Sequence, residues 1–141
     1  MELENRLKVY YVMAIFSMFF ALLGFTYNAW RMEVSEDNNT IRTASFEVLK
    51  VLAETQQLIY AAHYDQNEIE GDPRKGWVKI GLIVDLSFLI NQSVERRAQQ
   101  LRQAWQDNWG IMADDRDATN KLINEIERVR SEIKSTLIAL D

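Results

Sequence analysis

The sequence predicts an all-α fold in which a single N-terminal transmembrane helix continues into an antiparallel three-helix bundle, or coiled-coil, domain. Three observations support this prediction. The stretch from Val9 to Trp30 has no charged side chain, apolar residues then recur at helical spacings, and the 141 residues include only five glycines and one proline. So few turn-forming residues disfavour the many short strands of an all-β chain. The length suits one compact domain beyond the apolar stretch.

Residues 9–30 form the predicted membrane-spanning helix, after a short flank at residues 1–8. About 20 apolar residues, rising 1.5 Å each, cross a hydrocarbon core of roughly 30 Å. Tyr and Trp side chains favour the two membrane–water interfaces, and they stand at both ends of this stretch as Tyr10, Tyr11, Tyr27 and Trp30.

Two alternatives to a retained span remain open. A cleaved signal peptide has an apolar run of about 7–15 residues and a small-residue cleavage site, whereas cleavage after Ala29 would place Tyr27 at one of the small-residue positions. The other alternative is a cytosolic protein in which the apolar stretch is buried inside an oligomer.

Small and weakly polar residues recur along the predicted span at spacings of three and four. Such a stripe lets helix backbones approach closely in lipid, where no hydrophobic force drives helix association. Small residues are common in spans, so a chance stripe is the alternative. We expect the span to pack against its own copy or another membrane protein through Ala14, Ser17, Ala21, Gly24 and Asn28.

The basic residues beside the span predict its orientation. Arg6, Lys8 and the α-amine precede the span, whereas Arg31 follows it and is succeeded by acidic residues. Lys and Arg are enriched on the cytoplasmic side of membrane proteins. We therefore expect the N-terminus inside and residues 31–141 outside, which in a bacterium is the inner membrane with a periplasmic C-terminal domain.

Residues 31–141 form the predicted extramembrane bundle, with helices of about 32–66, 74–108 and 114–140. Pro73 suits the first turn of the second helix, Gly110 interrupts the chain after it, and Asp114 or Asp115 is a suitable N-cap for the third. Apolar or small residues form a seam along the first helix at Ile41, Ser45, Val48, Leu52, Thr55, Ile59 and Ala62. A second seam follows the third helix at Ala118, Leu122, Ile126, Val129, Ile133, Leu137 and Leu140.

Short connections make consecutive helices antiparallel. A single second helix would then return to the membrane surface, and it would bring Trp105 and Trp109 to the interface beside Trp30. These two tryptophans are therefore also predicted to be membrane-interface residues.

Composition disfavours several classes of function. A net charge of −5 argues against a nucleic-acid partner, which requires a basic face. There is no cysteine and only one histidine, so we expect no catalytic residues, no metal site and no cofactor.

The sequence favours a non-enzymatic protein with a helical protein-interaction domain, serving as an accessory, scaffold or regulatory subunit of a membrane complex. Its expected partners are the lipid bilayer and a protein, or a second copy, bound through the span and the coiled-coil helices. The alternative is a membrane-anchored sensor that holds a small ligand, or responds to pH, near Tyr60, His63, Tyr64 and Trp77.

Overall fold

A computed structural model describes residues 1–140 as four helices joined by turns. They are α1 (Glu2–His63), α2 (Pro73–Ser87), α3 (Gln92–Asn108) and α4 (Arg116–Ala139). The fold class is all-α, as predicted. Contacts divide the chain into two units, residues 1–37 and residues 38–141, and each is described by itself.

The first unit consists of the N-terminal part of α1. Every residue from 1 to 37 is exposed. The helix is not interrupted at the boundary of the unit, because α1 runs from Glu2 to His63 and contains both the apolar stretch and the first predicted seam. The prediction that the apolar helix continues into the first helix of the bundle is confirmed.

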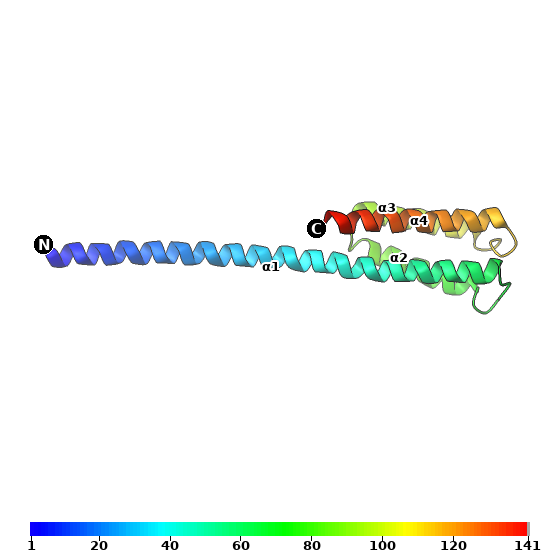
Figure 1. The fold of residues 1–141 in the computed structure, drawn as a ribbon, viewed down its shortest axis with the longest axis horizontal. Helices are drawn as coiled ribbons and strands as arrows, with labels where there is room; N and C mark the ends of the chain where they lie inside the picture. The colour runs from blue at the N-terminus through cyan, green and yellow to red at the C-terminus, as the bar shows by residue number, and fades with distance from the viewer. Residues whose placement is uncertain (141) are drawn as a thin grey trace. The chain divides into compact units, whose positions relative to one another are not determined.

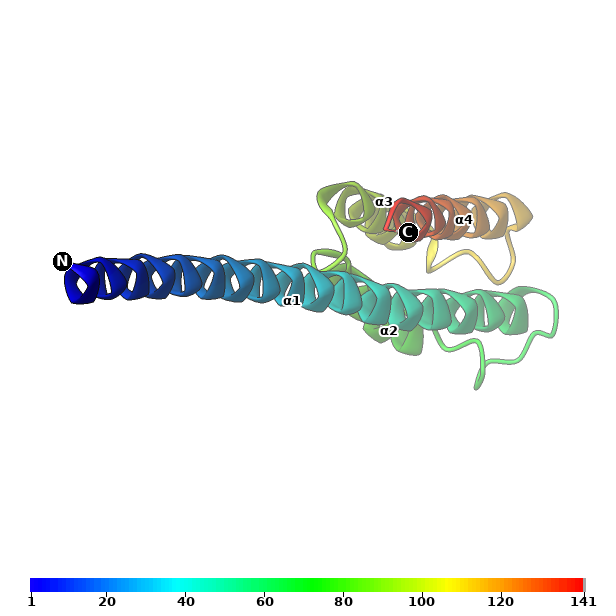
Figure 2. The same cartoon turned by 60° about the vertical axis from the view of Figure 1, so that its left-hand side comes forward.

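The second unit is a helical bundle built from the C-terminal part of α1 together with α2, α3 and α4 (Figures 1 and 2). The loops 64–72 and 109–115 lie at the end of the bundle where α1 terminates, which we call the distal end (Figure 1). The turn 88–91 and the C-terminus of α4 lie at the opposite end, where α1 enters the bundle, which we call the proximal end (Figure 1).

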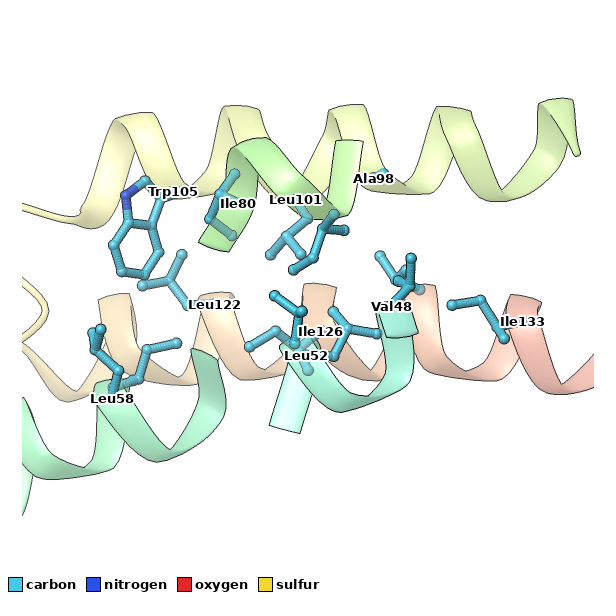
Figure 3. Packing of buried hydrophobic residues seen from close by; sticks show 14 of the residues in the cluster. Val48, Leu52, Leu58, Ile80, Ala98, Leu101, Trp105, Leu122, Ile126 and Ile133 are labelled. Atoms are coloured by element: carbon cyan, nitrogen blue, oxygen red, sulfur yellow. The ribbon is translucent and has the colours of Figure 1, made fainter. Parts of the chain in front are cut away.

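The core of the bundle is apolar and draws on all four helices (Figure 3). Both predicted seams face it. On α1 the seam residues from Ser45 to Ala62 are buried and Ile41 is half-buried, and on α4 those from Ala118 to Ile133 are buried while the last two are half-buried. Figure 3 shows side chains from α1 and α4 converging, among them Val48, Leu52, Leu122, Ile126 and Ile133.

The predicted single helix over 74–108 is wrong, because a turn at 88–91 divides it into α2 and α3. Asn91 explains the break. Its backbone is extended (φ −171°, ψ 169°), and its Oδ1 accepts a hydrogen bond from the Val94 amide at 2.8 Å, which caps α3. Its Nδ2 donates to Oγ1 of Thr136 on α4 at 2.8 Å. Asn91 therefore starts a new helix and attaches that start to α4.

The extra reversal also corrects the placement of two tryptophans. Trp105 is completely buried in the core, and Trp109 follows it at the distal end of α3. The neighbouring carbonyl of Met112 lies 3.1 Å from Nδ1 of His63, the last residue of α1. Trp105 and Trp109 thus lie at the end of the bundle opposite to the one predicted. Burial makes the assignment of Trp105 to the membrane interface wrong, whereas that of Trp109 stays a prediction.

Candidate functional site

The apolar stretch of α1 is the first candidate functional surface. α1 is the one helix in the described chain that is long and apolar enough to cross a membrane, and none of its most apolar 18-residue window is buried. A signal sequence would meet the same criteria. Exposure of so much contiguous apolar surface to water is unfavourable, and such surfaces mark contacts with lipid or protein.

The aromatic and small residues predicted to serve this stretch all lie on the uninterrupted helix α1. Tyr10, Tyr11, Tyr27 and Trp30 are exposed, and the rings of the last two have centroids 6.2 Å apart. Helical geometry places Ala14, Ser17, Ala21, Gly24 and Asn28 along one face. Nothing in the chain lies within 4 Å of a Cβ built at Gly24. Packing through this face stays a prediction.

His63 joins the distal end of α1 to the loop between α3 and α4. Its Nδ1 lies 3.1 Å from the carbonyl oxygen of Met112 and 3.0 Å from that of Ala113. Because both partners are acceptors, this nitrogen carries the proton and donates. Gln66 has a left-handed backbone (φ 51°), and its Nε2 donates to the Ala113 carbonyl at 3.2 Å. α1 ends at His63 rather than at the predicted residue 66, and the histidine ties the two distal loops together.

None of the hollows described in the structure is lined by more than one of the four residues predicted to surround a small ligand. Tyr60 and Tyr64 are exposed, with ring centroids 5.6 Å apart, and the His63 ring lies 4.7 Å from that of Tyr64. Trp77 instead packs against the core. A hollow of about 390 Å³ beside the distal loop is lined by Tyr60 but by none of the other three, and its remaining lining is largely polar and charged.

Two pairs of oppositely charged side chains lie in this region. Nζ of Lys79 on α2 donates to Oε2 of Glu54 on α1 at 2.5 Å, and this hydrogen bond and charge hold the pKa of the Glu54 carboxyl below its ordinary value. At the start of α2, Asp72 caps the helix by accepting from the Arg74 amide at 2.9 Å. The Arg74 guanidinium also bonds Asp72, which lowers the pKa of that carboxyl and raises the pKa of the arginine.

Sequence reasoning missed a charged hollow of about 550 Å³ between α3 and α4. Asp107, Lys121, Glu125 and Arg128 are among its lining residues. Arg128 Nη1 donates to Oε1 of Glu125 at 2.8 Å, whereas Oε2 of Glu125 is buried without a partner. The three charged residues of α4 recur at spacings of four and three, which is the only signal that the sequence carries for this hollow. No group of three or more potential metal ligands occurs within residues 1–140.

No family model matches the chain, and neither the curated proteins nor the solved structures include a match to it.

Proposed function

We propose that this chain is a non-enzymatic, single-pass membrane protein whose helical bundle binds another protein, as an accessory, scaffold or regulatory subunit of a membrane complex. The observation that carries the proposal is the apolar stretch of α1, which is fully exposed within the chain. A helix of this composition requires cover, and a bilayer supplies it along the entire stretch.

The flanking residues support an orientation with the N-terminus in the cytoplasm. Arg6 and Lys8 precede the apolar stretch, and Arg31 follows it. In a bacterium, the bundle would then lie in the periplasm, anchored in the inner membrane.

Two surfaces support a protein partner. The small-residue stripe would allow a second transmembrane helix to approach closely, and Ser17 and Asn28 could bond across such an interface. On the bundle, apolar side chains remain exposed away from the core at Phe46 on α1 and at Val78 and Leu82 on α2. Exposed apolar side chains of this kind are typical of interaction surfaces.

The test is extraction of the full chain in mild detergent at native expression, followed by size analysis and mass-spectrometric identification of co-purifying proteins. The proposal expects the chain in the membrane fraction together with a defined protein at fixed stoichiometry, or with its own copy. A monomeric chain without a partner would contradict it, as would recovery in the soluble fraction.

Substitutions in the apolar stretch separate insertion from assembly. Ala21→Ile and Gly24→Ile place bulky side chains in the small-residue stripe. Each is expected to abolish the association while leaving the chain in the membrane. Thr26→Ile is the matched control, because it also adds bulk but lies on another face, where Thr26 bonds only the Leu22 carbonyl of its own helix at 2.9 Å. If all three variants assemble to the same extent as the unsubstituted protein, packing through the stripe is excluded.

A further inference from the structure

Two segments at the proximal end of the bundle contain no charged residue, and Arg42 lies nearby on α1. Residues 86–94, which contain the turn between α2 and α3, include no Asp, Glu, Lys or Arg, and neither do residues 135–140 at the end of α4. The two segments are joined, because Asn91 Nδ2 donates to Thr136 Oγ1 at 2.8 Å. They therefore form one surface at the end of the bundle where α1 enters (Figure 1).

This surface exposes large apolar side chains. Phe88 in the turn is 63% exposed and Ile138 near the end of α4 is 76% exposed, with Leu89 also exposed beside the first. The surface is held firmly, since Asn91 caps α3 and Ser93 Oγ donates to Oε1 of Glu132 on α4 at 2.7 Å. Apolar side chains among uncharged polar groups, on an ordered backbone, suit the boundary between lipid headgroups and acyl chains.

The distal end has the opposite character. Its loops, residues 64–72 and 109–115, contain Asp65, Glu68, Glu70, Asp72, Asp114 and Asp115 but no Lys or Arg. Asp72 is paired with Arg74, and the remaining acidic groups still give this end an excess of negative charge. A leaflet that contains anionic lipid would repel it, because like charges near a membrane surface are unfavourable. The two ends of the bundle thus differ, because large apolar side chains are exposed at the proximal end and acidic side chains gather at the distal end.

The proximal end is close to the candidate span along the chain. The bundle begins at Asn38, and only residues 31–37 separate it from Trp30. In helical form this linking segment contributes about 10 Å of length at 1.5 Å per residue. The headgroup layer on each side of a bilayer is itself roughly 5–7 Å thick. The start of the bundle is therefore only about 10 Å along α1 from the end of the candidate span.

We propose that the proximal end of the bundle, with Phe88, Leu89 and Ile138, is a lipid-contacting surface that docks on the interfacial region of the bilayer. The inference rests on the proposed membrane anchor. Docking would fix the bundle against the membrane and turn its acidic distal end, with loops 64–72 and 109–115, away from it. The sides of the helices would then be left for a protein partner.

The test places a nitroxide on single cysteines of the full chain, which has no native cysteine. The Ile138→Cys and Phe88→Cys variants probe the proximal end independently. The Ile69→Cys variant is the matched control, because Ile69 is 75% exposed but lies in the distal loop. The Phe19→Cys variant reports on the span itself. Each labelled protein is reconstituted in phosphatidylcholine vesicles, and its collisions with lipid-soluble oxygen and a water-soluble nickel chelate are compared.

The proposal expects the ratio of oxygen to nickel collisions to be several-fold higher at positions 88 and 138 than at position 69, with position 19 higher still. Equal ratios at 69, 88 and 138, with position 19 in lipid, would overturn the docking and leave the anchor standing. Low collision with both reagents at 88 and 138 would also overturn it, because a protein then covers this end. A water-exposed position 19 would overturn the anchor and the docking together.

Discussion

Replacement of Gly76 by alanine is expected to destabilise the bundle, although alanine favours a helix. A Cβ at this position of α2 would lie 2.1 Å from Cζ2 and 2.3 Å from Cη2 of Trp105. The indole is completely buried and cannot swing into solvent. Overpacking of a core costs about 1–3 kcal/mol. Alanine in place of glycine stabilises a helix by about 0.5–1 kcal/mol. The net loss of stability for Gly76→Ala is therefore about 0–2.5 kcal/mol.

Gly81 on the same helix is the matched control, because no atom lies within 4 Å of a Cβ built there. Gly81→Ala should stabilise the bundle by about 0.5–1 kcal/mol. The difference between the two variants isolates the contact with Trp105, since the propensity gain is common to both. That difference is expected to be about 1–3 kcal/mol.

Urea titration of the full chain in mild detergent, followed by circular dichroism and tryptophan fluorescence, measures both variants. Trp105→Phe removes the two ring atoms that alanine would meet, so in the Trp105→Phe background Gly76→Ala should become far less harmful. A double-mutant cycle gives that coupling directly. If Gly76→Ala stabilises the protein as much as Gly81→Ala does, the close packing of α2 on Trp105 is refuted.

Three further outcomes follow from the structure, each measured by the same urea titration. Gly71→Ala should destabilise the bundle by about 1–3 kcal/mol, because its Cβ would lie within 2.5 Å of a backbone atom of α1; an unchanged midpoint would contradict this contact. Asp115→Ala should lower the free energy of unfolding by about 1 kcal/mol, because the carboxylate accepts hydrogen bonds from two amides at 2.8 and 3.1 Å at the start of α4. Asp114→Ala is the control, and it should change the stability little if Asp115 is the cap. The pairing with Lys79 lowers the pKa of Glu54 in the folded state, so its contribution is present above the ordinary carboxyl pKa and is lost as the pH falls through the lowered value. The difference in stability between the unsubstituted protein and Glu54→Gln should therefore be larger near pH 7 than near about pH 3. A difference that does not change with pH would be inconsistent with the pair.

Much of the fold could be predicted because long helices leave periodic patterns. The seam from Ser45 to Ala62 and the one from Ala118 to Ile133 are both buried, and Pro73 and Asp115 occupy the helix starts expected of them. The turn at 88–91 was missed because residues 82–91 are mostly apolar and contain no glycine or proline. The sequence marks this turn only by Asn91, which is a good N-cap residue. An asparagine alone does not show that a helix starts there.

The missed turn also accounts for the misplaced residues at the distal end. One additional reversal of the chain changes which end of the bundle Trp105 reaches. The apolar pattern of a helix predicts its buried face but not the direction in which the helix runs in the bundle. The contact of His63 with the carbonyls of Met112 and Ala113 depends on that same reversal, so it could not be anticipated. The apolar stretch of α1 was readable directly, because its pattern involves no long-range contact.

The most direct test of the central proposal is the sidedness of α1 in sealed, right-side-out membrane vesicles. Single cysteines at Glu4 and at Glu36, on either side of the apolar stretch, are labelled with a membrane-impermeant maleimide before and after the vesicles are opened. A single span with the proposed orientation predicts that position 36 reacts in intact vesicles, whereas position 4 reacts only after opening. Reaction of both positions in intact vesicles, or of neither, would contradict a membrane-spanning α1.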